Sequence, residues 1–170
     1  GASQIYVRRL GQLQASPLAG TTEALSPFFS PDGQWLAFFA DGKLKKISVS
    51  GGAAVTLADA PGGKGGSWGD DGNIVFVPGQ SLGTSVLQLV SSAGGKVEAL
   101  TKPVQGEDSH RWPQVLPGAK AVLYTSNAQI IGGYDDANIV VRPLPSGTPK
   151  ILIRGGYYAR YLPSGHLVYM

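Results

Sequence analysis

Residues 65–69 carry the residue types of a hydrolase nucleophile. Their sequence, Gly-Gly-Ser-Trp-Gly, matches the Gly-x-Ser-x-Gly pattern, in which a strained turn between a strand and a helix exposes a serine hydroxyl to a carbonyl carbon. That chemistry needs a helix after the serine, and histidine and acidic partners beside it. No helical pattern follows Gly69. We therefore expect Ser67 to lie on an inner strand of a sheet, and we expect the protein not to be an enzyme.

Residues 107–111, Glu-Asp-Ser-His-Arg, form the densest polar cluster of the chain. Their side chains have the chemistry to hold a cation or to contact a ligand. The alternative is a solvated loop in which the histidine and the carboxylates cap turns. The chain has 2 histidines, His110 and His166, which argues against a multi-histidine metal site. We expect no metal and no cofactor.

Charge and composition exclude several other classes. The net charge is +3 and lysines and arginines never run beyond pairs, so the sequence predicts no basic track for nucleic acid. No stretch approaches the roughly 18 consecutive apolar residues of a membrane span, and the first residues do not have the shape of a signal peptide. The absence of cysteine excludes disulfides and thiolate catalysis. Residues 62–66 lack the Gly-Lys-Ser/Thr ending of a phosphate loop.

The elements that must position these residues are predicted to be strands. The chain has 170 residues, of which 25 are glycine and 12 are proline, whereas 15% are charged and 42% are hydrophobic. Glycine and proline disrupt helices but suit tight turns between strands. No segment keeps a helical apolar period over a helical length. The composition therefore predicts an all-β fold.

A turn with similar flanks recurs along the chain and indicates a repeat. The turn glycines Gly33, Gly72, Gly118 and Gly165 are 39, 46 and 47 residues apart, and each is followed by a short apolar strand. A period of roughly 40–50 residues is typical of one blade, the four-stranded antiparallel sheet of a β-propeller. Three complete blades are expected at residues 25–59, 66–102 and 110–154. A fourth, composite blade would join a hairpin at 157–170 to one at 4–18.

The repeat resembles the TolB-type, WD-repeat-like propeller family of bacteria. The stretch from Pro27 to Phe38, Pro-Phe-Phe-Ser-Pro-Asp-Gly-Gln-Trp-Leu-Ala-Phe, is similar to the family motif of a strand end, an Asp-Gly turn and an inner-sheet strand. Residues 65–69, 110–113 and 161–166 also resemble the propeller that follows the kinase domain in some bacterial membrane-bound serine/threonine kinases. The resemblance covers about residues 4–170. It implies a periplasmic or extracellular location, although the compartment is not evident from the residues.

Four blade equivalents leave two ways to close a ring. One chain could form a four-bladed ring, or two chains could exchange their half-blades and form an eight-bladed homodimer. Four blades must each turn about 90° and eight about 45°, and nearly aligned sheets suit the smaller step. We therefore favour the homodimer.

Loops between blades are expected to meet at one end of the central channel and to bind a ligand there. Loops of a rigid scaffold often carry recognition. The longest insertion between paired strands is expected at residues 129–136, where we expect Asp135 and Asp136 to face solvent and not to bind a metal. The tryptophans, Trp35, Trp68 and Trp112, are assigned to packing between blades. A basic channel mouth would suit an acidic peptide or another anion. The candidate ligand-binding residues are Lys64, Glu107, Asp108, His110, Arg111, Arg154, Tyr158 and Arg160.

The functional hypothesis is a non-catalytic propeller that recognises a protein or another ligand and assembles through its own chain ends. The alternative is an accessory or sensor propeller of a larger enzyme, a kinase or a peptidase, whose catalytic domain is absent from these residues. Fold alone does not choose between them, because propellers host many functions.

Overall fold

The computed structural model describes residues 3–79, 85–127 and 133–170. All of its strands pair antiparallel with their neighbours in each sheet, beside one isolated parallel bridge between Ser85 and Ser109, and the sole helical element in these ranges is a single 3₁₀ turn, η1 (Pro117–Ala119). The prediction of an all-β fold is confirmed. Of the insertion predicted at 129–136, residues 129–132 lie outside the described ranges.

Three sheets have four strands each, and within each sheet the strands pair in chain order. The first sheet contains β3 (Leu25–Phe29), β4 (Trp35–Ala40), β5 (Lys43–Ser48) and β6 (Val55–Asp59). The second contains β7 (Gly66–Trp68), β8 (Asn73–Phe76), β9 (Gln88–Ser91) and β10 (Glu98–Ala99). The third contains β11 (Ser109–Val115), β12 (Ala121–Asn127), β13 (Asn138–Pro143) and β14 (Lys150–Arg154).

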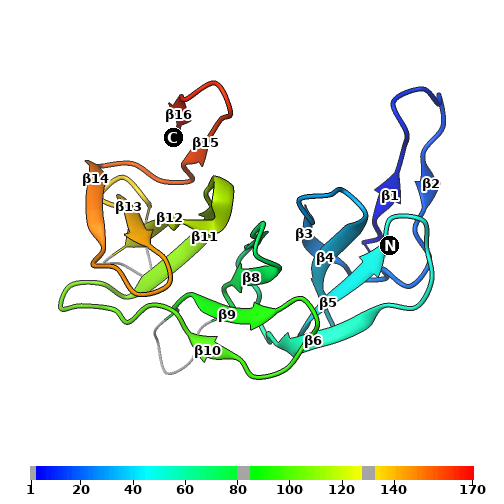
Figure 1. The fold of residues 1–170 in the computed structure, drawn as a ribbon, viewed down its shortest axis with the longest axis horizontal. Coiled ribbons are helices and arrows are strands. Elements are labelled where there is room, and N and C mark those ends of the chain that lie inside the picture. The colour runs from blue at the N-terminus through cyan, green and yellow to red at the C-terminus, as the bar shows by residue number, and fades with distance from the viewer. Residues whose placement is uncertain (1–2, 80–84, 128–132) are drawn as a thin grey trace.

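A two-stranded sheet lies at each end of this series. β1 (Tyr6–Val7) pairs with β2 (Ser16–Pro17), and β15 (Arg160–Tyr161) pairs with β16 (Leu167–Val168). The sheets follow one another along an open arc, and the two short hairpins stand at its opposite ends (Figure 1). The two hairpins that were predicted to share a composite blade therefore form separate sheets within this chain.

The second strand of each four-stranded sheet is apolar on both faces, because each sheet packs between two neighbours. On β4, Leu36 and Phe38 join a cluster with Leu18, which follows β2, whereas Phe39 packs with Phe76 of the second sheet. The alternation of side chains along a strand sends successive residues to opposite faces. The other second strands divide in the same way, with Ile74 and Phe76 opposite Val75 and Val77 on and just beyond β8, and Val122 and Tyr124 opposite Leu123 on β12.

The turns between the first and second strands explain the recurring glycines. Gly33 and Gly72 have φ angles of 67° and 80°, which side chains with a Cβ atom rarely adopt. In the first of these turns, Asp32 accepts hydrogen bonds from the Ser30 hydroxyl at 2.5 Å and from the Gln34 N–H at 3.0 Å. The hydrogen bond from Ser30, followed by that from Gln34, holds the pKa of the Asp32 carboxyl below its usual value.

Candidate functional site

The first strand of each sheet contributes to one concave surface. β3 contacts β7, and β7 contacts β11. Residues of β3, β7, β11 and β15, together with residues next to them, line a cavity of about 460 Å³. A second cavity of about 300 Å³ shares Phe29, Trp68 and Gln114 with the first. We call the two cavities together the inner cleft.

A backbone feature recurs where these strands enter the inner cleft. Ser26, Gly65, Trp112 and Tyr158 all have positive φ angles, of 47°, 101°, 50° and 53°. This conformation is unfavourable for residues with large side chains. In β3 and β11 it coincides with a shift of register, between Leu25 and Phe28 and between Arg111 and Gln114. The kink therefore occurs at equivalent positions of successive sheets.

Two residues after the kinks at Gly65 and Trp112, a side chain reaches toward the next sheet. The Ser67 hydroxyl accepts a hydrogen bond from the Val115 N–H at 2.9 Å. The Gln114 amide accepts one from the Tyr161 N–H at 2.7 Å and donates one to the Tyr161 carbonyl at 3.0 Å. Phe28 and Arg160 occupy the same position in the first sheet and in the C-terminal hairpin. These four positions follow the order of the sheets and connect the inner strands sideways.

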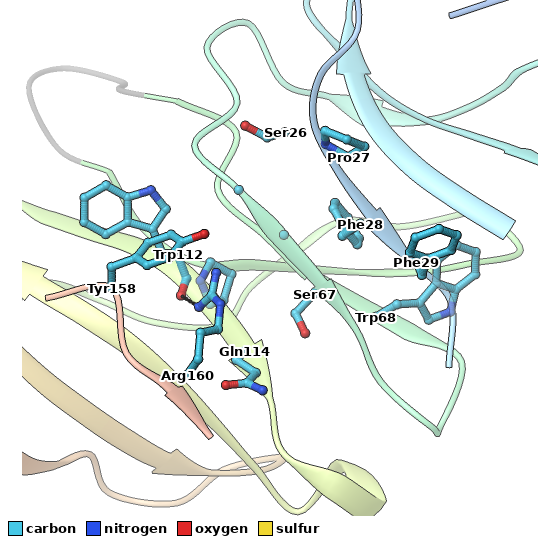
Figure 2. A pocket seen from close by; sticks show the side chains of 13 residues that line it. Ser26, Pro27, Phe28, Phe29, Ser67, Trp68, Trp112, Gln114, Tyr158 and Arg160 are labelled. Atoms are coloured by element: carbon cyan, nitrogen blue, oxygen red, sulfur yellow. Dashed lines mark hydrogen bonds between the residues drawn. The ribbon is translucent and has the colours of Figure 1, made fainter. Parts of the chain in front are cut away.

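Aromatic side chains line both sides of the inner cleft. Figure 2 shows Phe28, Phe29 and Trp68 on one side and Trp112 with Tyr158 on the other, with Ser67 between them. A side chain on Gly66 would meet the Phe28 ring, since a Cβ atom there would lie 2.5 Å from two ring carbons. Glycine at this position therefore allows the β3 side chain to lie over β7.

Trp112 is the centre of a larger aromatic cluster at one end of the inner cleft. Its ring centroid lies 4.9 Å from that of Tyr134, 5.9 Å from that of Tyr157 and 5.5 Å from that of Tyr158. The inter-ring angles range from 39° to 77°, so these rings form a faceted wall and not one flat platform. The sequence analysis had assigned Trp68 and Trp112 to packing between blades, whereas both also line the inner cleft.

Two arginines stack on this aromatic wall. The Arg160 guanidinium carbon is 4.4 Å from the Tyr158 ring centroid, and that of Arg111 is 5.5 Å from the Tyr134 ring centroid. Arg160 Nη1 also donates to the carbonyl oxygens of Trp112 at 3.1 Å and of Ala159 at 3.0 Å. Arg111 Nε is buried and has no acceptor among the residues that the structure describes. No arginine takes part in the ion pairs found among the described residues.

His110, predicted to face a ligand, is buried. Its side chain is 1% exposed, its Nδ1 lies 2.8 Å from the Thr101 hydroxyl and its Nε2 lies 3.2 Å from a Glu107 oxygen. Glu107 also accepts a hydrogen bond from the Ser126 hydroxyl at 2.7 Å. Thr101 in turn accepts from the Leu87 N–H at 2.9 Å. The cluster at residues 107–111 is thus partly a buried network between the second and third sheets, and His110 is inaccessible to a ligand.

Burial determines the ionisation of this network. Desolvation lowers the pKa of the His110 imidazole, and the hydrogen bond and charge of Glu107 oppose this shift without reversing it. Burial alone would raise the pKa of Glu107, but hydrogen bonds from Ser126, the Val104 N–H and His110 outweigh it and lower the pKa. At neutral pH the network therefore pairs a neutral imidazole with a carboxylate.

The other candidate ligand residues lie at several different places in the structure. Tyr158 and Arg160 line the inner cleft. Lys64 lines a different cavity, and Arg154 ends β14, at the opposite edge of its sheet from β11. The Asp108 carbonyl accepts a hydrogen bond from the Ser85 N–H, and its own N–H donates to Asn127. The structure does not gather all eight residues at one site.

Within residues 3–79, 85–127 and 133–170, no three histidine, cysteine or acidic side chains gather as metal ligands would. No helix in the same ranges has the length and apolar character needed to cross a bilayer.

Sequence reasoning missed Phe28, Trp112 and Gln114 as residues of the inner cleft. The repeat itself carried a usable signal, because aligning the inner strands places Ser67, Gln114 and Arg160 at one position. That alignment does not show which side chains reach the next sheet. The hydrogen bonds join residues 47 and 48 positions apart and depend on how the sheets stack.

Stacked antiparallel sheets whose first strands line a common concave surface are the architecture of a β-propeller. The solved structures that the chain resembles are propellers of the TolB type and of enzymes. A candidate TolB from Agrobacterium tumefaciens has a TM-score of 0.70 at 20% identity, with 92% of this chain and 57% of that chain covered. TolB from Acinetobacter baumannii has a TM-score of 0.70 at 17% identity, with 95% and 41% covered.

Propellers of peptidases show the same fold at lower similarity. The β-propeller domain of the trilobed protease from Pyrococcus furiosus, which has an open velcro topology, gives a TM-score of 0.58 at 15% identity, with 92% of this chain and 51% of that chain covered. The chain thus spans about half the length of these structures. No protein-family model matches the sequence, and no curated protein matches it significantly. The similarity to solved structures shows that the chain has a TolB-like propeller fold.

Proposed function

We propose that this chain is a non-catalytic propeller module that recognises a protein or peptide in the inner cleft. The observation that carries the proposal is the cleft itself, which four successive sheets build from aromatic side chains and from Arg160, which forms no ion pair with an acidic side chain of the described residues. Concave apolar surfaces with a few polar groups are typical binding sites. TolB-like and peptidase propellers share the fold, which is consistent with a recognition scaffold.

The environment of Ser67 supports the non-catalytic part of the proposal. Ser67 lies on strand β7 and not at a strand-to-helix turn, and its oxygen already accepts a hydrogen bond from the Val115 N–H. Hydrolysis of p-nitrophenyl acetate by the wild type and by Ser67→Ala tests this point. We expect equal background rates, and a rate that falls with the substitution would contradict a non-catalytic role.

Selection from a display library of random peptides tests recognition. Peptides that the wild type enriches are measured again with Trp112→Ala and with a matched control, Trp35→Ala, whose indole lies outside the inner cleft. We expect binding to be lost with the first variant and kept with the second. No enrichment, or equal loss with both variants, would contradict recognition in the cleft.

We further propose that the chain assembles through its hairpins into an eight-bladed homodimer. β1 pairs with β2 alone and β16 pairs with β15 alone, so β1 and β16 each have one strand edge without a partner strand among the described residues. Exposed edges favour pairing with another chain. Large apolar side chains are also exposed at both ends of the arc. They are Tyr6, Leu10 and Leu13 at one end and Leu162, Val168, Tyr169 and Met170 at the other.

Mass in solution tests the assembly. Light scattering on a sizing column is expected to give roughly twice the 17.7 kDa of one chain. A mass of one chain would favour the four-bladed ring, in which the two hairpins of a single chain pair. Removal of residues 1–12 should leave an open edge that aggregates, and a soluble and equally stable truncation would contradict the composite blade.

The second candidate function is an accessory propeller of a larger enzyme. It is favoured by the similarity to propellers of a prolyl endopeptidase and of the trilobed protease. The complete reading frame that contains these residues tests it, since the accessory role requires a catalytic domain encoded in the same frame.

A further inference from the structure

We infer that the inner cleft binds an extended peptide in which an aspartate or glutamate carboxylate lies beside an apolar side chain. The carboxylate would pair with Arg160, the apolar side chain would pack on the aromatic walls, and a peptide carbonyl would accept from the Trp68 N–H. This inference rests on the proposed recognition function and specifies its ligand class.

The Trp68 N–H is a backbone donor that points away from β8, toward the open edge of the sheet at the cleft. The Val77 N–H donates to Gly65 and the Gly69 N–H donates to Asn73, so the alternation of an antiparallel pair turns the Trp68 N–H away from β8. The equivalent N–H groups of Val115 and Tyr161 are bound by the preceding sheet. For Trp68 the preceding sheet offers Phe28, which has no acceptor, and this donor is available to a ligand.

Arg160 supplies the positive charge. Two carbonyl oxygens anchor its Nη1, and the Tyr158 ring supports its flat face, so the guanidinium is held in place before a ligand arrives. Figure 2 shows Arg160 on the Trp112 side of the cleft, facing the space between the two aromatic walls. No carboxylate of the described residues neutralises it. An arginine of this kind binds a carboxylate through charge-assisted hydrogen bonds.

The remaining polar groups favour a peptide over an anionic sugar. A sugar needs many hydrogen-bonding side chains for its hydroxyls, but Ser67 and both ends of the Gln114 amide are already used between the sheets. The tilted rings around Trp112 also lack the flat platform on which a sugar face stacks. The two cavities adjoin, since they share Phe29, Trp68 and Gln114, and together they leave room for a peptide chain that passes from one to the other.

Fluorescence anisotropy with two labelled, terminally blocked pentapeptides tests the inference. The first probe is Gly-Phe-Asp-Phe-Gly, and the second replaces the aspartate by asparagine. We expect the wild type to bind the aspartate probe about tenfold more tightly, since a charge-assisted hydrogen bond contributes at least this much. Arg160→Gln should remove the preference, and Arg160→Lys should keep part of it. Arg8→Gln is the matched control, because this exposed arginine follows β1 and should leave the preference unchanged.

The outcomes separate the ligand class from the recognition function. Equal binding of both probes that is lost with Trp112→Ala would overturn the requirement for a carboxylate but not the recognition function. A short oligogalacturonate serves as the anionic sugar. Tighter binding of this sugar than of the aspartate probe would overturn the assignment of a peptide ligand. Failure of both probes, while the library yields other peptides that need Trp112, would overturn this ligand class alone. A preference that survives Arg160→Gln, with an unchanged unfolding temperature, would overturn the role of Arg160.

Discussion

Gln114 clamps the C-terminal hairpin to the third sheet, and its removal is a direct test of the sideways connection. Its amide makes two hydrogen bonds to Tyr161, a donor–acceptor pair of 2.7 Å and one of 3.0 Å. Each such bond contributes about 0.5–1.5 kcal/mol net. Gln114→Ala should therefore lower the free energy of detaching the hairpin by about 1–3 kcal/mol, because both bonds are lost together.

Amide hydrogen exchange at Tyr161 measures this effect locally. The Tyr161 N–H loses its acceptor, so its exchange should accelerate roughly fivefold to 150-fold. The Val122 N–H, in the core of the same sheet, should change far less. Gln114→Glu keeps the acceptor for the Tyr161 N–H but loses the donor, and an intermediate acceleration is expected. The matched control is Gln34→Ala, which removes an exposed amide from a turn.

Two results would refute this reasoning. Unchanged exchange at Tyr161 in Gln114→Ala would mean that the hairpin is held without Gln114, by the packing of Ala159 and Leu167 and by the hydrogen bond from Arg160 to the Trp112 carbonyl. An equal acceleration in every strand would mean that the hairpin has no separate opening and that the variant destabilises the whole chain.

The remaining predictions concern the buried network, the cleft floor and the core. The pKa of His110 is lower in the folded state than the unfolded value near 6.5, so folding favours the neutral imidazole. The free energy of unfolding is therefore highest above this value and falls as pH drops below it. Urea unfolding of His110→Gln should show a flatter dependence between about pH 7.5 and 5.5 than the wild type, and parallel curves would contradict this. Gly66→Ala should cost about 1–3 kcal/mol in thermal unfolding because the new Cβ meets Phe28, and a double-mutant cycle with Phe28→Ala that shows no coupling would contradict the contact. Phe38→Ala should cost about 3–5 kcal/mol, because its fully buried ring fills the cluster between β4 and the N-terminal hairpin, and a loss below about 1 kcal/mol in urea unfolding would contradict that packing.

Local patterns in the sequence were sufficient to predict strands, turns and their repetition. The run from Leu36 to Ala40 is apolar without alternation, which indicates a strand buried on both faces, and the structure packs both faces of β4. The turn glycines Gly33 and Gly72 adopt left-handed conformations that follow from glycine itself. These features are decided within a few residues, and for that reason the all-β prediction was confirmed.

The candidate site depended on contacts between sheets, which local patterns do not report. The polar run at residues 107–111 indicated a solvated or ligand-facing loop, whereas stacking of the second and third sheets buries His110 beside Thr101. Ser67 resembled a nucleophile in its pentapeptide, but its partner in space is the Val115 N–H of the next sheet. The amino-acid sequence thus determined the strands and turns, because backbone preference and side-chain alternation are local. The tertiary structure alone decided the inner cleft, because it arises where side chains from four different sheets meet.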